Sequence, residues 1–207
     1  GALFDLGPGF FVERGAASQF AFIMVNASTA ARTILWTRGT VSPLRPDEVD
    51  LALVGAAKGL LIDDLEPAAA LPAARHARAR GIPVLIDAGS LRDGVRELLP
   101  HCDYIFASER FAEQISGGAG PRSALAALDS FGPKACGVTL GERGSIALSR
   151  GKIIEAPGFA VRAVDTTGAG DVFHGAFLVA ALRSGVWPRG RSGRPVASRA
   201  RSTCRRR

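Results

Sequence analysis

The first strongly apolar stretches of the chain are two short runs, at residues 20–25 and 33–36, and both are rich in aromatic and β-branched side chains. The residues between them, 26–32, are small or polar. Short β-rich runs separated by a polar turn are typical of a β-hairpin. The pattern therefore predicts a two-stranded hairpin in the first part of the chain.

From about residue 47 the pattern changes to short apolar runs that alternate with amphipathic stretches. The apolar runs predict strands at residues 59–63, 82–87, 103–107 and 136–140. The amphipathic stretches predict helices at residues 67–80, 108–115 and 121–131. Gly81 is a typical stop signal for the first helix, and Ser108 is a typical cap for the second. This alternation indicates a parallel sheet covered on both faces, and residues 145–155 predict a second hairpin.

Parallel sheets bind their ligands beyond the carboxyl ends of the strands. The residues at those ends are therefore candidates for a site, and they are Asp63, Asp64, Asp87, Ser90, Ser108, Glu109, Thr139 and Gly141. Asp63 and Asp64 are explained equally well by a contact to a ligand or metal and by the preference of helix starts for acids.

The formal net charge of +7 does not describe the whole chain. Residues 186–207 contain eight arginines and no acid, so residues 1–185 carry about −1. A folded basic face for nucleic acid is therefore not supported. The composition of segment 186–207 predicts a disordered, solvated tail. An Arg-rich arm that binds nucleic acid is the less favoured interpretation. A shifted reading frame in a GC-rich gene would also give this composition.

The three cysteines, Cys102, Cys136 and Cys204, have no metal-ligand or redox spacing. No apolar run is long enough to span a membrane, and no signal peptide is visible. These features predict a cytoplasmic protein without a membrane partner.

The most informative stretch is residues 163–178, where a β-like run leads into a glycine-rich turn and a helix predicted from about Ala169 to Leu182. Gly168 and Gly170 allow a tight turn and a close approach to a ligand. The free amides of the first helical turn favour an anion, and Asp171 lies within that turn. An amide cradle beside a carboxylate is suited to phosphoryl transfer to a hydroxyl, although a glycine turn with one acid alone would be an ordinary helix start.

The full string resembles a known signature. The ribokinase-like (PfkB) carbohydrate kinases carry a similar motif to Asp165-Thr166-Thr167-Gly168-Ala169-Gly170-Asp171, followed by Gly175-Ala176-Phe177-Leu178 on the helix. Residues 138–145 resemble the strand and turn beneath the nucleotide in that family, although alone they would predict only a strand and a turn. The resemblance implies that Thr139, Gly141, Gly144 and Thr167 contact the nucleotide.

A third segment departs from the family pattern. Ser108 and Phe111 stand where many relatives carry Asn-x-x-Glu, a pair that helps to organise Mg²⁺ through water. The departure resembles ketohexokinase-like and sulfofructose kinase-like members, which implies a ketose-type substrate. Glu109 or Glu113 could serve the metal, but exposed acids at a helix start explain them equally well, so the metal ligands stay unassigned.

The resemblance implies a fold and a mechanism. The fold is a three-layer α/β/α sandwich with a small β-sheet lid, to which the hairpin at about residues 18–40 belongs. Asp171 would take the proton of the sugar hydroxyl, and the amides of Gly168, Ala169 and Gly170 would form the anion hole. ATP and Mg²⁺ would be the cofactors, K⁺ would lie near Asp165, and the full-length parent would be a homodimer.

Two elements of the family are expected to be missing. The early strand with a sugar-binding Asp and a Gly-Gly signature does not precede residue 1, and the helices that cover the adenine do not follow residue 185. Residues 1–185 are therefore predicted to be an incomplete kinase domain, and the chain by itself is predicted to be inactive. The alternatives are a nucleoside kinase of the same family and a non-catalytic remnant. His174 is predicted to be packed or hydrogen-bonded rather than catalytic.

Overall fold

A computed structural model describes residues 12–26, 32–161, 163 and 165–184 of the chain. The chain divides into two compact units, residues 1–44 and residues 45–207. The predictions for segment 186–207 and for Cys204 lie outside the described residues.

The first unit contains the predicted hairpin. Strand β1 (Phe20–Val25) pairs antiparallel with β2 (Arg32–Thr37), with Phe22 opposite Leu35. The two strands confirm the prediction, and the turn at residues 27–31 lies outside the described residues. Apolar side chains on both faces are exposed within this unit, including Phe22 and Trp36.

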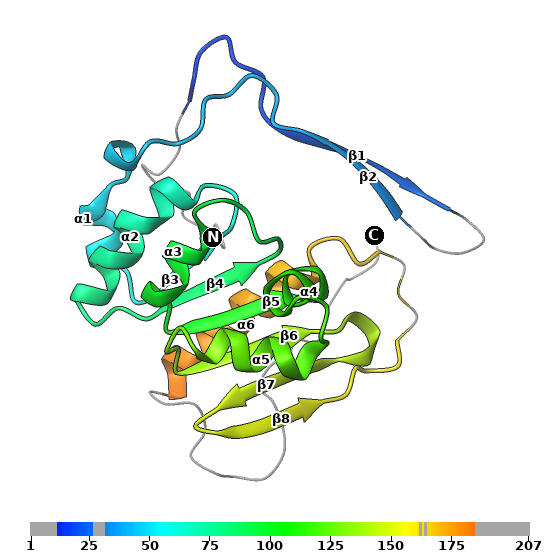
Figure 1. Cartoon of the computed structure of the whole chain (residues 1–207). Coiled ribbons are helices and arrows are strands. Elements are labelled where there is room, and N and C mark those ends of the chain that lie inside the picture. The colour runs from blue at the N-terminus through cyan, green and yellow to red at the C-terminus, as the bar shows by residue number, and fades with distance from the viewer. Residues whose placement is uncertain (1–11, 27–31, 162, 164, 185–207) are drawn as a thin grey trace. The chain divides into compact units, whose positions relative to one another are not determined.

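The second unit is built on one six-stranded sheet in the order β3-β4-β5-β6-β7-β8 (Figure 1). The strands are β3 (Leu60–Asp63), β4 (Val84–Ala88), β5 (Tyr104–Ser108), β6 (Ala135–Thr139), β7 (Ser145–Ser149) and β8 (Lys152–Ala156). The first four are parallel, as predicted, while β7 and β8 add to β6 antiparallel. The predicted second hairpin is thus part of a mixed sheet. Neighbouring strands follow one another in sequence, so each parallel crossover places a helix on a sheet face.

The helices of this unit are α1 (Leu51–Ala56), α2 (Pro67–Ala79), α3 (Val95–Leu98), α4 (Glu109–Ser116), α5 (Pro121–Asp129) and α6 (Ala169–Ser184). Three 3₁₀ turns, at Pro46–Glu48, Leu99–His101 and Gly141–Arg143, complete the described elements. The predicted start of α4 is confirmed, because the Ser108 hydroxyl caps it by accepting a hydrogen bond from the Phe111 amide at 3.1 Å. No helix among the described residues is long and apolar enough to cross a membrane.

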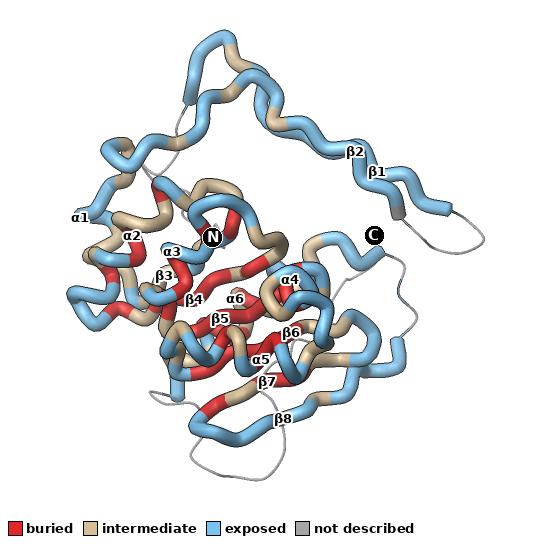
Figure 2. The backbone as a smooth tube through the Cα atoms, viewed as in Figure 1, coloured by how far each residue is buried: buried red, intermediate tan, exposed pale blue. Residues whose placement is uncertain are grey.

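The alternation of side chains along the strands creates two separate cores. Ile86 and Ile105 point to a core shared with α2, α3, α4 and α5, whereas Leu85 and Phe106 point to a core shared with α6. Successive side chains of a strand face opposite sides of a sheet, so both faces of β4 and β5 are buried. Figure 2 shows these central strands as the most continuously buried part of the chain. The expected three-layer α/β/α arrangement is confirmed.

Aromatic rings hold α6 against its face of the sheet. The Phe106 ring centroid lies 4.4 Å from that of Phe177 and 5.5 Å from that of Phe173. Tyr104 packs edge-on against Phe177 at 5.3 Å. Such pairs add to the stabilisation from apolar burial. Phe106, only 2% exposed, is therefore the centre of the α6 contact.

The thiols in the cores are chemically quiet. Cys102 and Cys136 are buried and not disulfide-bonded. Burial raises the pKa of each of these thiols to about 12. The reactive thiolate is therefore scarce at neutral pH, and both residues act as small apolar core residues.

We expect Phe106→Ala to lower the free energy of unfolding of the second unit by about 3–5 kcal/mol, the cost of emptying a large aromatic site. Phe159→Ala is the matched control, because Phe159 is 65% exposed. Urea unfolding followed by circular dichroism measures both. Equal costs for the two variants would show that Phe106 does not anchor α6.

Candidate functional site

The turn before α6 is closed by local hydrogen bonds. The Asp165 carboxylate accepts from the Thr167 amide at 2.8 Å, and the Ala169 amide donates to the Thr166 carbonyl at 3.2 Å. Gly168 has a φ of +75°, in the left-handed region that side chains disfavour. The Val172 amide then donates to the Gly168 carbonyl at 3.0 Å, which is the first helical hydrogen bond. The glycine-rich segment therefore reverses direction and begins a helix, as the sequence predicted.

Two amides in this first turn remain available to a ligand. No hydrogen bond to the described residues uses the amides of Gly170 and Asp171, whereas the Ala169 amide is engaged by the turn. The Asp171 side chain is exposed at the same end of α6. Unpaired amides at a helix N-terminus attract an anion, and the dipole of this 16-residue helix adds to that attraction.

His174 lies one turn further along α6 and is 2% exposed. Its Nδ1 atom lies 2.6 Å from the carbonyl oxygen of Gly170 and 2.9 Å from Oδ2 of Asp87. The prediction that His174 is packed and hydrogen-bonded is confirmed. Asp87 was a strand-end candidate without an assigned role, and its partner could be found only once α6 was placed over β4.

Asp64 supports a neighbouring loop. It is 5% exposed, and its carboxylate accepts a hydrogen bond from the Ser90 amide and lies 3.6 Å from the Arg92 guanidinium. Both partners follow β4, so Asp64 ties the start of the β3–α2 connection to the β4–α3 loop. These contacts give Asp64 a structural role, although not the predicted one of a helix-start acid, because the first turn of α2 contains no acid.

The predicted nucleotide side lies at the end of β6. The Thr139 hydroxyl donates to the Ala107 carbonyl at 3.3 Å, and a 3₁₀ turn from Gly141 to Arg143 follows. Gly144 has a φ of +94°, and a Cβ at this position would collide with the carbonyl oxygen of Ala156 and the amide nitrogen of Gly158. Gly144 therefore has a packing role, because it lets the β6–β7 turn lie directly against the segment after β8.

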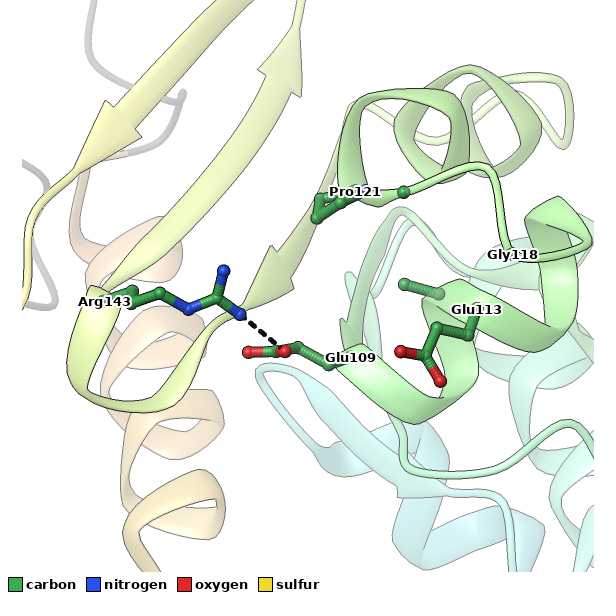
Figure 3. Close-up of a pocket in the computed structure, with 7 residues that line it drawn as sticks. Glu109, Glu113, Gly118, Pro121 and Arg143 are labelled. Atoms are coloured by element: carbon green, nitrogen blue, oxygen red, sulfur yellow. Dashed lines mark hydrogen bonds and ion pairs between the residues drawn. The ribbon is translucent and has the colours of Figure 1, made fainter.

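A small pocket of about 230 Å³ lies between this turn and α4 (Figure 3). Its lining residues are Glu109, Ala112, Glu113, Gly118, Gly120, Pro121 and Arg143. Two of these residues, Arg143 and Glu109, form an ion pair of 2.6 Å. No group of three His, Cys, Asp or Glu side chains among the described residues could hold a metal ion.

The departure from Asn-x-x-Glu has a structural explanation. Ser108 caps α4, and its hydroxyl also donates to the Gly89 carbonyl at 2.8 Å. Phe111 is fully buried in the core under α4. Phe111 is therefore not accessible to a ligand, and the Ser108 hydroxyl is engaged in two hydrogen bonds.

The chain matches the family model described as "pfkB family carbohydrate kinase" over residues 11–198. It is 32% identical over 179 residues to a deoxyribokinase of Salmonella typhimurium, which covers 82% of this chain and 58% of that protein. It is 36% identical over 115 residues to a ribokinase of Haemophilus influenzae, covering 53% and 38% of the two chains. The crystal structure of a ribokinase from Thermotoga maritima superposes with a TM-score of 0.64 at 26% identity, covering 83% and 58%. The chain therefore spans less than two thirds of the length of these relatives.

We expect Gly144→Ala to destabilise the second unit more than Gly151→Ala does. Both glycines have a positive φ, which costs about 1–2 kcal/mol for a residue with a side chain. Only Gly144 also faces backbone atoms, since a Cβ at Gly151 would meet nothing within 4 Å. The difference in unfolding free energy should be about 1–3 kcal/mol, the scale of overpacking. Equal costs in urea unfolding would mean that the turn can separate freely from the segment after β8.

Proposed function

The chain belongs to the pfkB family of carbohydrate kinases, and we propose that its protein transfers the γ-phosphoryl group of ATP to a hydroxyl of a small sugar. The observation that carries the proposal is the first turn of α6. It presents an exposed carboxylate, Asp171, beside the unengaged amides of Gly170 and Asp171. This arrangement joins a proton acceptor to an anion site at one helix end.

In the reaction proposed for this site, one O–P bond forms and one O–P bond breaks. Asp171 accepts the proton of the attacking hydroxyl as the new O–P bond forms, and the bond between the γ-phosphorus and the β–γ bridging oxygen breaks to release ADP. The anion hole predicted at Gly168, Ala169 and Gly170 would stabilise the charge on the moving group. Because the Ala169 amide donates to Thr166, the amides of Gly170 and Asp171 are the ones ready to contribute.

The nucleotide is proposed to lie along the end of β6 and the turn before α6, with Thr139, Gly141, Gly144 and Thr167 beside it. The groups of this chain that are suited to bind a polyphosphate are the amides at the start of α6. Mg²⁺, when bound, neutralises phosphate charge, and it usually takes only one or two carboxylates together with phosphate oxygens and water. The lack of a three-residue cluster in the described ranges is compatible with such a site. K⁺ is proposed near the Asp165 turn.

For the substrate we propose a pentose, because the chain is 32% identical to a deoxyribokinase over 82% of its length and 36% identical to a ribokinase over 53% of its length. The ketose expectation rested on Ser108 and Phe111. Because Ser108 caps a helix and Phe111 is a core residue, these two residues give less support to a ketose substrate. The nucleoside alternative is tested in the same experiment. We also propose that the intact protein is a cytoplasmic homodimer.

A substrate panel tests the proposed class. In a coupled ATP assay on the intact protein we expect turnover with ribose or 2-deoxyribose to exceed turnover with fructose, adenosine and cytidine. A preference for fructose would restore the ketose expectation. A preference for adenosine or cytidine would show that the substrate is a nucleoside. Absence of turnover with every acceptor would support the interpretation that the protein is a non-catalytic remnant.

We expect Asp171→Asn in the intact protein to lower kcat by about 10²-fold or more, the usual scale of general-base catalysis, while ATP affinity is kept. Asp129→Asn, at the far end of α5, is the control for removing one carboxylate. Turnover near the wild-type value in the D171N variant would exclude Asp171 as the base.

We expect Gly170→Val to weaken nucleotide affinity by at least about tenfold, equivalent to ~1.4 kcal/mol. Apart from its chain neighbours and the backbone of its own helix, a Cβ at Gly170 would meet no atom of the described residues within 4 Å, so the substitution is expected to intrude on ligand space. Calorimetry measures the affinity, and Gly170→Ala should have a smaller effect. Unchanged nucleotide affinity in the G170V variant would show that the turn is an ordinary helix start without a role in nucleotide binding.

A further inference from the structure

His174 connects two parts of the second unit that are far apart in sequence. Asp87 lies near the carboxyl end of β4, paired with Asp63 of β3 and Phe106 of β5. Gly170 belongs to the first turn of α6. One nitrogen atom, His174 Nδ1, lies within 2.9 Å of both the Asp87 carboxylate and the Gly170 carbonyl. The imidazole therefore joins a central strand to the candidate anion site.

The two partners determine where the imidazole proton resides. A carbonyl oxygen and a carboxylate oxygen are both acceptors, so Nδ1 must carry a hydrogen and donate it. Nε2 is buried without a hydrogen-bond partner in the described part of the chain. A buried polar atom without a partner is unfavourable, so an apolar side chain would fill this space at a lower cost in stability than His174 does. The hydrogen bonding of Nδ1 offsets this cost.

The Gly170 carbonyl is covalently connected to one of the two free amides of the candidate anion site. It forms one rigid, planar peptide unit with the amide of Asp171. A hydrogen bond that fixes the direction of the carbonyl oxygen therefore also fixes the direction of the Asp171 N–H, which is one of the two unengaged amides. Donors held in place before the reaction need no reorganisation when charge develops.

We propose that His174 is a positioning residue that locks the Gly170–Asp171 peptide to the end of β4 through Asp87. The proposal rests on the proposed function of this turn. His174 does not touch the reacting atoms, because its ring is enclosed by the protein and contacts Phe106 and Phe173. Its effect is exerted on the orientation of the Asp171 amide and, through the same backbone, of the Asp171 carboxylate.

Two variants at residue 174 separate positioning from packing. In His174→Asn the side-chain amide nitrogen occupies nearly the place of Nδ1 and can donate to the same oxygens. In His174→Leu a side chain of comparable bulk has no donor. Asp87→Asn and Asp87→Leu make the matching pair on the strand, since only the Asn side chain keeps an acceptor.

We expect His174→Leu to lower kcat in the intact protein by about 10- to 10²-fold, the penalty of a small misplacement, with less change in KM for the sugar. His174→Asn should recover most of that loss, and Asp87→Leu should resemble His174→Leu. Urea unfolding is measured alongside. Wild-type kcat in the H174L variant overturns the proposal, as does equal loss of kcat in the H174L and H174N variants.

A spectroscopic measurement gives an answer that does not depend on turnover. The ¹⁵N resonance of the Asp171 amide responds to hydrogen bonding at the carbonyl of the same peptide unit. We expect it to shift in the H174L variant and to return toward the wild-type position in the H174N variant. An unmoved resonance contradicts the lock. Failure of the wild-type protein to phosphorylate any acceptor would instead contradict the proposed function and leave this comparison intact.

Discussion

The packing of α6 on the sheet is the interaction on which the candidate site depends. The first turn of α6 contains the two available amides and the Asp171 carboxylate, and Thr167 directly precedes it. The other proposed nucleotide contacts, Thr139, Gly141 and Gly144, belong to β6 and the turn that follows it. Phe106 on the central strand β5 carries that packing through its contacts with Phe173 and Phe177. A change in this aromatic contact would move the whole first turn relative to the strand ends. Apolar burial therefore determines the geometry of a polar site.

The aromatic contact alone does not fix the rotation or the axial position of a helix, because apolar packing has little directional preference. The directional element is the hydrogen bonding of His174, which connects Asp87 to the Gly170 carbonyl. The His174 donor is buried and the Asp87 side chain is 27% exposed, so solvent competes only partly with the contact between them. Apolar packing and a buried polar contact thus have complementary parts in holding α6.

The carboxyl edge of the sheet concentrates acids, and the structure provides partners for two of them. Asp64 lies beside Arg92 and the Ser90 amide, and Asp87 lies beside His174. Asp171 differs, since it is exposed at the helix end. Neutralising or hydrogen-bonding the inner carboxylates reduces their repulsion of an incoming polyphosphate. That difference is consistent with support roles for the inner acids and a chemical role for Asp171.

Local sequence signals were sufficient for most elements and for the turn that carries the proposed chemistry. Apolar runs predicted the strands, Gly81 and Ser108 marked a helix end and a helix start, and the glycines before Asp171 predicted a helix beginning at Ala169. The short helices α1 and α3 were not predicted, because elements of six and four residues are too short to show a period.

Tertiary structure decided the rest. It joined β7 and β8 to the parallel strands, it buried Phe111 in the core under α4, and it brought His174 to Asp87. Local periodicity reports which face of an element is apolar, and it contains no information on which distant residue will pack against that face. The sequence by itself therefore determined most of the elements and the glycine-rich turn of the candidate site, while only the folded chain determined the partners that hold that turn in position.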